Sequence, residues 1–498
     1  MHLRPYQNYA VAHTYGAFVS GECSKVLIVI PTGGGKTIIF SRLAQIIARN
    51  KRVLILAHRE ELIQQAVDKL FKSTGLRASI EKADDFAPLD AQIVVASVQT
   101  LQRAARRERF APGHFGLIIV DEAHHCLANS YQGTLNYFEH AWVLGVTATP
   151  DRTDKKGLGE YFEHIAYEVT LKELVLDGYL SPIRVQRLPV KIDLAAVRTV
   201  AGDYSADDLG EAVKTHLATI AEMLARDFAD KKTLVFLPLC RISEEFASQC
   251  RMFGIKAEHV EGGSPDRAEI LARFTSGQTT LLSNAMLLTE GYDEPTVDCI
   301  VCLRPTKSRS LYAQIIGRGT RLHAGKTHLL ILDFLWLTGK HKLAKPASLL
   351  GLKEEEEAKL ATMDGDLLGN AEAVQRDAQE ALEEKLKKLA NRKAKTIDPL
   401  EFELVGVKVA DYEPVMKWEE KPPTKPQTET LEKAGVDLEA VPNAGLASKL
   451  ISAIVDRREK SLATMKQVKL LTRFKVQDAA NISFVDAGEI ITKRLGTR

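Results

Sequence analysis

A glycine-rich turn near the start of the chain carries residue types that bind phosphate. It separates the apolar run 26–30 from the helix-like stretch 38–48 and reads Pro31-Thr32-Gly33-Gly34-Gly35-Lys36-Thr37. Glycines let several backbone N–H groups converge on phosphate oxygens, lysine reaches the terminal phosphates, and a threonine hydroxyl binds Mg²⁺. The turn therefore predicts a site for a nucleoside triphosphate and Mg²⁺. Ile30 stands where the GxxxxGK[ST] pattern has glycine, so a glycine turn without a ligand is the alternative.

Two carboxylates follow the next informative apolar run. Residues 117–120 are all apolar, and Asp121-Glu122-Ala123-His124 come directly after them. A buried parallel strand places the residues at its carboxyl end where α/β sheets bind ligands. We expect Asp121 to complete the Mg²⁺ site and Glu122 to polarise the attacking water as a general base. A solvated strand end is the alternative, but the glycine turn upstream favours nucleotide hydrolysis.

Together these motifs resemble those of superfamily 2 helicases and translocases of the DEAD/DEAH-box kind. The resemblance implies that the nucleotide is ATP, and it assigns further residues of the first half by motif. In Arg4-Pro5-Tyr6-Gln7 it implies that Arg4 and Gln7 bind the nucleotide, with Gln7 reading the adenine. The residues implied to grip nucleic acid are His58, Arg59, Gln99 and Thr100. Those implied to couple hydrolysis to this grip are His124, Thr147 and Thr149.

A second set of family-like motifs follows the apolar run 233–237. Leu288-Thr289-Glu290-Gly291-Tyr292-Asp293 is similar to the T-x-G-x-D motif, and residues 314–321 are similar to the Q-x-x-G-R-x-x-R motif. The planar, permanently charged fork of arginine suits a role on a γ-phosphate. The resemblance implies catalytic roles for Gln314, Arg318 and Arg321, nucleotide contacts for Gly291 and Asp293, and a nucleic-acid contact for Thr289.

Alternation of short apolar runs with helical periods predicts an α/β fold. The resemblance implies two tandem RecA-like P-loop lobes with parallel sheets, which we place at residues 1–180 and 181–345. ATP would then be enclosed only when the lobes close. We expect a charged helical extension at 346–420 and a small α-helical C-terminal module at 421–498.

The charged extension has two open interpretations. Its stretch 354–395 could be a solvated spacer or a nucleic-acid arm, and the segment 402–409 predicts one or two short strands. Glu401 and Glu403 would lie on the polar face of such a strand. A metal-dependent nuclease is disfavoured, because Asp398, Glu403 and Lys408 do not have the spacing that its acidic and E-x-K-like residues need.

The C-terminal module contains a suspected internal repeat with an offset of 40 residues. The matched pairs are Thr424 and Thr464, Gln427 and Gln467, Leu431 and Leu471, Lys433 and Arg473, Val436 and Val476, Ala447 and Ala487, and Ile451 and Ile491. Each unit predicts a helix, a turn and a second helix, although chance alignment is the alternative. From residue 449 onward eleven Lys or Arg oppose five Asp or Glu, a local charge of +6 by subtraction. A nucleic acid, an acidic protein partner or a merely soluble surface would fit this excess.

Composition limits the partners only weakly. The 67 basic and 65 acidic residues give a net charge of +2, so any nucleic-acid surface must be local. Six scattered cysteines, with one close pair at Cys299 and Cys302, indicate core thiols and no structural zinc. No apolar stretch is long enough for a membrane span, and no signal-peptide core is evident, which predicts a cytoplasmic protein.

Within superfamily 2 the chain is most similar to the bacterial RadD-like DNA repair helicases and their phage relatives, over residues 1 to about 345. They share a core like that of the type III restriction res subunit. The resemblance implies an ATP-dependent DNA helicase or translocase in repair, recombination or phage DNA metabolism, with single-stranded or forked DNA as its track. The alternatives are a nucleic-acid-stimulated ATPase switch, a motor subunit of a restriction or defence complex, and an RNA helicase. A protein partner for the C-terminal module is a further expectation.

Overall fold

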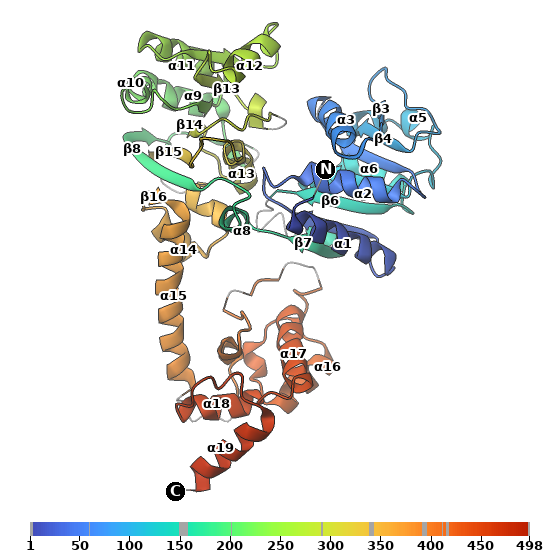
Figure 1. Cartoon of the computed structure of the whole chain (residues 1–498), viewed down its shortest axis with the longest axis vertical. Helices are drawn as coiled ribbons and strands as arrows, with labels where there is room; N and C mark the ends of the chain where they lie inside the picture. Colours follow the sequence, from blue (N-terminus) through green and yellow to red (C-terminus); the bar gives the residue numbers. More distant parts are fainter. Residues whose placement is uncertain are drawn as a thin grey trace. The chain divides into compact units, whose positions relative to one another are not determined.

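The computed structural model describes residues 3–58, 60–148, 158–200, 202–289, 292–337, 343–390, 396–410, 412–414 and 418–496. The chain forms two compact units, Met1–Glu372 and Ala373–Arg498 (Figure 1). No described helix is both long and apolar enough to cross a membrane. All six cysteines are free thiols, and Cys299 and Cys302 are buried, as the sequence predicted.

The first lobe of the N-terminal unit is built on a parallel seven-stranded sheet. Its strand order is β3-β4-β2-β5-β6-β1-β7, and all neighbouring strands are parallel. The central strands are buried along almost their whole length, which explains why their sequences are continuous apolar runs rather than alternating ones. The bounds are β1 (Lys25–Val29), β2 (Val53–Ala57), β3 (Ser79–Glu81), β4 (Ile93–Ser97), β5 (Leu117–Asp121), β6 (Trp142–Thr147) and β7 (His164–Glu168).

Helices flank this sheet (Figure 1), and buried apolar side chains form two clusters around it. One cluster includes Phe18, Phe40 and Leu70 of the first three helices. The other includes Phe110, Phe115 and Phe138. The helical elements are α1 (Pro5–Val19), α2 (Lys36–Ile47), α3 (Glu60–Thr74), α4 (Val98–Leu101), α5 (Ala104–Arg107), η1 (Ala123–Leu127), α6 (Asn129–Tyr137) and α8 (Leu171–Leu176).

The second lobe has its own seven-stranded sheet, in the order β12-β13-β11-β14-β15-β8-β16. Only the short β16 runs antiparallel to its neighbour. The strands are β8 (Ile183–Asp193), β11 (Thr233–Phe236), β12 (Ala257–Val260), β13 (Leu281–Asn284), β14 (Cys299–Cys302), β15 (Leu329–Leu337) and β16 (Gly365–Asp366). The helical elements include α9 (Ala206–Lys214), α10 (Leu217–Asp227), α11 (Cys240–Met252), α12 (Arg267–Thr275), η2 (Leu287–Thr289) and α13 (Arg309–Gly317). β9 (Thr199–Val200) and β10 (Asp203–Tyr204) form a separate hairpin. Two parallel-sheet lobes confirm the predicted fold class.

The second lobe continues beyond residue 345, where the sequence had placed its end. The elements η3 (Pro346–Leu350), α14 (Glu354–Leu360) and β16 follow. Leu349, Leu360 and Ala371 are buried in the same apolar cluster as the strands of both lobes. The charged surface of α14 concealed these apolar contacts in the sequence.

The segment predicted as short strands at 402–409 has a different structure. Pro399–Val405 is the 3-10 helix η4, because the carboxylate of Asp398 accepts from Leu400 N at 2.9 Å and Pro399 occupies the first turn. Glu401 is only 2 % exposed and its carboxylate is 2.7 Å from Lys469 Nζ. The sequence interpretation of Glu401 as part of a polar strand face was therefore wrong.

The C-terminal unit repeats its local contacts at an offset of 40 residues. Its helices are α16 (Lys425–Ala434), α17 (Ala444–Glu459), α18 (Met465–Arg473) and α19 (Phe484–Gly496), with η5 (Leu438–Ala440) between the first two. Gln427 Nε2 donates to Ala444 O at 3.1 Å, and Gln467 Nε2 donates to Phe484 O at 3.0 Å. Gly435 and Lys475, which end the equivalent helices, are both left-handed, with φ of 82° and 56°. The two helical hairpins thus have matching local structures.

Two basic residues of this unit serve its packing. Lys469 pairs with Glu401, and Arg457 is 9 % exposed with its guanidinium bonded to the carbonyl oxygens of Ala463 and Ala480. Part of the local positive charge counted from the sequence therefore forms contacts within the folded unit. The long helix α15 (Leu367–Ala390) extends across the boundary between the two units.

Candidate functional site

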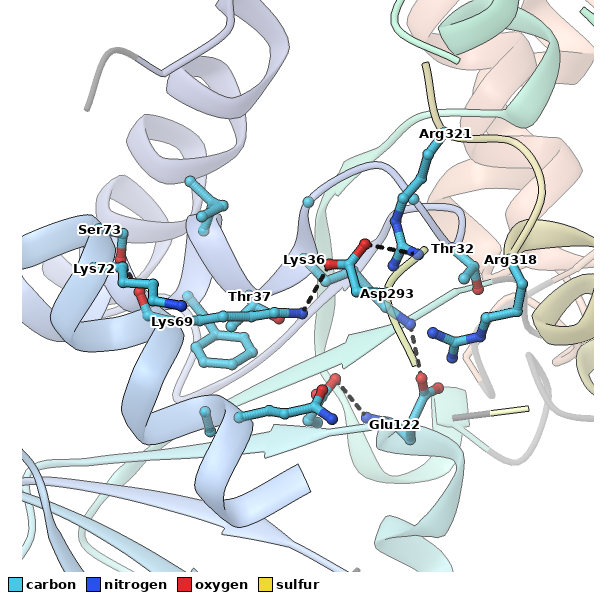
Figure 2. Close-up of a pocket in the computed structure, with 17 residues that line it drawn as sticks. Thr32, Lys36, Thr37, Lys69, Lys72, Ser73, Glu122, Asp293, Arg318 and Arg321 are labelled. Atoms are coloured by element: carbon cyan, nitrogen blue, oxygen red, sulfur yellow. Dashed lines mark hydrogen bonds and ion pairs between the residues drawn. The ribbon is translucent and has the colours of Figure 1, made fainter. Parts of the chain in front are cut away.

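A cleft of about 390 Å³ lies between the carboxyl ends of the first sheet and the motifs of the second lobe (Figure 2). Five lysines and arginines and three acidic residues line it, an excess of two positive charges. Such a balance favours a polyanionic ligand. The lining residues are Thr32, Gly33, Gly35, Lys36, Thr37, Ile38, Phe40, Gln65, Ala66, Lys69, Lys72, Ser73, Asp121, Glu122, Asp293, Arg318 and Arg321.

The glycine turn forms the floor of this cleft and passes into α2 at Lys36. Gly35 has a φ of 82°, and a Cβ there would lie 2.6 Å from Gln7 Nε2. A Cβ on Gly34 would lie 2.6 Å from the Ile30 side chain. Glycine is therefore required at both positions by conformation or by close approach. Ile30, the departure from the usual pattern, packs against Gly34 and fills space in the core.

The N-terminal segment is attached to the same turn. Tyr6 OH donates to Gly34 O at 2.6 Å, and Gln7 Nε2 lies 3.4 Å from the same oxygen. The Gln7 side chain also accepts from Arg4 N at 3.0 Å. Arg4 lies over the ring of Tyr179, 5.0 Å from its centroid, a partner that no sequence motif had marked. The structure therefore brings Arg4 and Gln7 to the edge of the predicted nucleotide site.

Lys36 and Glu122 meet at the centre of the cleft, with Nζ 2.8 Å from Oε1 (Figure 2). Glu122 has a left-handed backbone, with φ 53° and ψ 62°, at the point where β5 passes into η1. Burial alone would raise its pKa, but Lys36 and His124 lower the pKa below the ordinary value. Glu122 Oε2 is buried without a hydrogen-bond partner in the described part of the chain. Lys36 thus orients one carboxylate oxygen, and the other, which His124 Nδ1 faces at 3.6 Å, has an unused acceptor position.

Asp121 has the opposite electrostatic character. Burial, with the neighbouring charge of Glu122, raises its pKa to about 6. Its Oδ1 accepts from Glu122 N at 3.0 Å. Two adjacent carboxylates, one buried and one partly buried, favour a cation, and hard oxygen donors suit Mg²⁺. The donor set of Asp121 and Thr37 therefore fits the predicted magnesium site.

The second lobe supplies both arginines to the cleft. Arg318 donates to Thr289 O at 3.0 and 2.6 Å and to Tyr292 O at 2.7 Å, so it holds the preceding motif. Arg321 lies 2.9 Å from Asp293 (Figure 2), and burial lowers its pKa. Gln314 is buried in α13 and does not line the cleft.

Five cleft residues on α3, Gln65, Ala66, Lys69, Lys72 and Ser73, escaped the sequence analysis. Gln65, Lys69 and Lys72 share one helical face, and a search for polar residues spaced by three or four positions after β2 would have found them. Lys69 Nζ lies 3.7 Å from Asp293 Oδ2, which joins the two lobes. Burial lowers the pKa of Lys69.

The residues expected to grip nucleic acid have mixed positions. Gln99 Nε2 donates to His58 O at 2.8 Å, so the two strand-end motifs are adjacent. Thr100 is buried, and its hydroxyl accepts from Ala83 N at 3.2 Å. Thr289 is fully buried and donates to Met286 O at 2.7 Å. Neither hydroxyl faces solvent in this structure. Arg59 lies outside the described residues.

Two of the expected coupling residues, His124 and Thr147, lie beside the carboxylate motif and the glycine turn, respectively. His124 Nδ1 is 3.6 Å from Glu122 Oε2. Thr147 is buried at the end of β6, and its carbonyl accepts from Ile30 N at 2.9 Å, beside the glycine turn. Thr149 and Gly291 lie outside the described residues.

Comparison with known protein families gives two matches, one for each lobe, in the same order along the chain. A family described as the res subunit of type III restriction enzymes matches residues 1–152. The helicase conserved C-terminal domain matches residues 215–323. These matches cover the glycine turn and the carboxylate motif in the first case and the arginine motif in the second.

Individual known proteins are also similar to this chain. IRC3 of Saccharomyces cerevisiae, whose name describes an ATP-dependent helicase, is 33% identical over 380 residues, covering 71% of this chain and 54% of that protein. The endonuclease subunit of the Escherichia coli type I restriction enzyme EcoAI is 28% identical over 377 residues, covering 66% and 46%. The chain thus spans about half the length of these relatives.

A solved fragment described as an HsdR subunit of a type I restriction enzyme from Vibrio vulnificus YJ016 has a TM-score of 0.54 and 25% identity. The match covers 67% of this chain and 64% of that fragment. A closer relation to the RadD-like group stays a prediction. The motif order, the two lobes and these matches agree, and the chain belongs to superfamily 2 of the ATP-dependent helicases and translocases.

Proposed function

We propose that this protein is an ATP-driven DNA helicase or translocase that couples Mg-ATP hydrolysis to movement along DNA or to its unwinding. The observation that carries the proposal is the composition of the cleft. Lys36 and Glu122 of the first lobe and Arg318 and Arg321 of the second lobe line the same cavity. Phosphoryl transfer needs this combination of a positioned base and cations that stabilise the transferred group.

Nucleotide binding would change the partner of Lys36. An arriving terminal phosphate competes with Glu122 for the ammonium group, which is 2.8 Å from the carboxylate in this structure. Loss of Lys36 as a partner removes one of the charges that lower the pKa of Glu122. Glu122 then becomes a stronger base toward the attacking water. Asp121 and Thr37 would hold Mg²⁺, which supplies charge neutralisation on the phosphate oxygens.

The arginines would act when the lobes close around the phosphates. Arg321 is paired with Asp293, which also faces Lys69 of the first lobe. A phosphate group carries more charge than this carboxylate and would compete for both cations. Binding and hydrolysis would therefore alter the contact between the lobes. Nucleic-acid contacts at His58, Arg59, Gln99, Thr100 and Thr289 would convert that change into movement, with Thr100 and Thr289 acting after a local rearrangement.

DNA is the proposed track, in repair, recombination or phage DNA metabolism. Support comes from relatives named as subunits of restriction enzymes, a class of enzyme that acts on DNA. The C-terminal unit adds positive charge outside the motor, and it would contact the DNA or a protein partner.

The test is the steady-state ATPase rate without nucleic acid and with single-stranded DNA, duplex DNA or single-stranded RNA, using Glu122→Gln as the blank. Stimulation by DNA supports the proposal. Stimulation by RNA alone would make the protein an RNA helicase, and a rate indifferent to all three would indicate a protein-activated switch. Strand displacement on forked DNA then separates unwinding from translocation.

A second candidate function is the motor subunit of a restriction or defence complex. The match of residues 1–152 to a restriction subunit family and the similarity to two type I restriction subunits favour it. Co-purification of the tagged chain from its natural host tests this candidate. A stoichiometric partner with nuclease or methyltransferase activity would support it, whereas a motor that purifies alone and remains stimulated by DNA would not.

A further inference from the structure

Three side chains with different donor atoms meet at the carboxyl edge of the second sheet, away from the nucleotide cleft. Cys240 begins α11, His259 lies in β12, and Glu261 follows that strand. One donor atom from each residue lies within 4.8 Å of the others. His259 Nε2 and Glu261 Oε2 are 3.9 Å apart. None of the motifs found in the sequence includes these residues.

Hydrogen bonds orient the imidazole of His259. Its Nδ1 is 2.7 Å from Ser243 Oγ, which donates to Ser283 Oγ at 3.0 Å. Ser283 Oγ donates in turn to Ser243 O at 2.9 Å. When Nδ1 carries the imidazole proton, every hydrogen in this series of hydrogen bonds has one acceptor. Nε2 then presents its lone pair toward Glu261 and Cys240.

The charge state of the imidazole is compatible with a ligand role. Burial lowers the pKa of His259, although Glu261 opposes this effect. In the described part of the chain, no lysine or arginine forms an ion pair with Glu261. A neutral imidazole lone pair and a carboxylate at this distance repel each other unless a proton or a cation lies between them.

The donor set selects the kind of cation. Thiolate sulfur and imidazole nitrogen bind borderline metals such as Zn²⁺, whereas Mg²⁺ and Ca²⁺ prefer oxygen alone. Three protein ligands leave one tetrahedral position for water. Ser243 would be the partner that fixes the ring of a ligating histidine, as such sites generally require. We propose that Cys240, His259 and Glu261 form a binding site for a zinc-class divalent cation on the second lobe.

Occupancy would connect the start of α11 to the end of β12. Burial and the neighbouring Glu261 raise the pKa of the Cys240 thiol to about 11, so the incoming cation must displace the thiol proton, which passes to solvent. The site uses no residue of the nucleotide cleft. The proposed metal site can therefore be tested independently of the proposed ATPase activity.

Cobalt is the probe, because a thiolate bound to Co²⁺ gives a charge-transfer absorption band that oxygen and nitrogen ligands do not give. The thiols of the full-length protein are first reduced, and the reductant is then removed. The protein is titrated with Co²⁺ in the presence of excess Mg²⁺, which occupies carboxylate sites. We expect one equivalent of Co²⁺ to produce the band and one equivalent of Zn²⁺ to remove it. Cys240→Ser should abolish the band, and His259→Gln should weaken Co²⁺ binding at least tenfold.

The matched control is Cys23→Ser, which removes another partly exposed free thiol and should leave the titration unchanged. Circular dichroism of every variant shows whether the fold is kept. Absence of the band in the folded wild-type protein at one equivalent would overturn the proposal, and so would a band that persists in Cys240→Ser. Bound zinc measured by mass spectrometry after dialysis gives a second readout, and the proposal expects its loss in Cys240→Ser.

Discussion

Lys69 on α3 of the first lobe and Asp293 of the second lobe face each other across the nucleotide cleft, with Nζ 3.7 Å from Oδ2. The same carboxylate is 2.9 Å from Arg321. Asp293 therefore neutralises a cation from each lobe in the cavity where a polyphosphate would bind. A partly exposed pair at this distance contributes little to stability. The pair is important because a bound phosphate would compete with Asp293 for both cations.

Lys69→Met should weaken ATP binding by roughly tenfold, because a cation that can transfer from Asp293 to phosphate is lost. The measurement is the affinity for a fluorescent ATP analogue, with the KM of ATP hydrolysis beside it. Lys214→Met on α9 is the control, since Lys214 also pairs with an acidic residue but lies outside the cleft. Equal affinities in the two variants would refute a role for Lys69.

Lys36→Ala and Glu122→Gln should separate binding from chemistry. Lys36→Ala should abolish measurable nucleotide binding and turnover, because the phosphate loses its main cation. Glu122→Gln should keep ATP affinity and lower kcat by about 10²–10⁴-fold, the range for loss of a general base. Both variants should remain folded by circular dichroism. Normal turnover in either variant would show that the catalytic site lies elsewhere.

Lys326 should give the protein a distinctive alkaline response. Its ammonium group donates to the carbonyl oxygens of Val297, Gly319 and Arg321, and burial lowers its pKa to about 8. The unfolded chain, with a pKa near 10.5, binds more protons than the folded one between these values, so this residue makes folding more favourable as pH rises from about 8 to 10.5.

The gain from Lys326 is about 3 kcal/mol at most. Urea unfolding of the wild type and of Lys326→Met at pH 7.5 and pH 9.5 measures it. The wild type should gain unfolding free energy relative to the variant at the higher pH. If the difference in unfolding free energy between the two proteins does not change with pH, the lowered pKa of Lys326 would be contradicted.

Glu401 and Lys469 should be energetically coupled in the C-terminal unit. Their 2.7 Å pair is nearly excluded from solvent, so Lys469→Met leaves a buried carboxylate without its partner. We expect Lys469→Met or Glu401→Leu alone to cost about 3–5 kcal/mol of unfolding free energy. The double variant should recover much of that loss, because no charge is then stranded. Additive losses in the double-mutant cycle would mean that the pair is not coupled.

Local sequence determined the parts of the site that depend on neighbouring residues. The glycine turn, the start of α2 and the carboxylates after β5 could be recognised because backbone conformation and burial of a short strand leave a mark within a few residues. The 40-residue repeat was visible for the same reason, since each helix start carries its own Thr and Gln cap.

The tertiary structure decided which distant residues share a partner. Lys36 and Glu122 are 86 positions apart, and their contact depends on β1 and β5 delivering both to one edge of a parallel sheet. Glu401 was misassigned because burial beside Lys469 cannot be inferred from a charged segment. Tyr179 and the group formed by Cys240, His259 and Glu261 have no local signature. Their proximity arises from long-range packing, which places side chains by geometry rather than by sequence spacing.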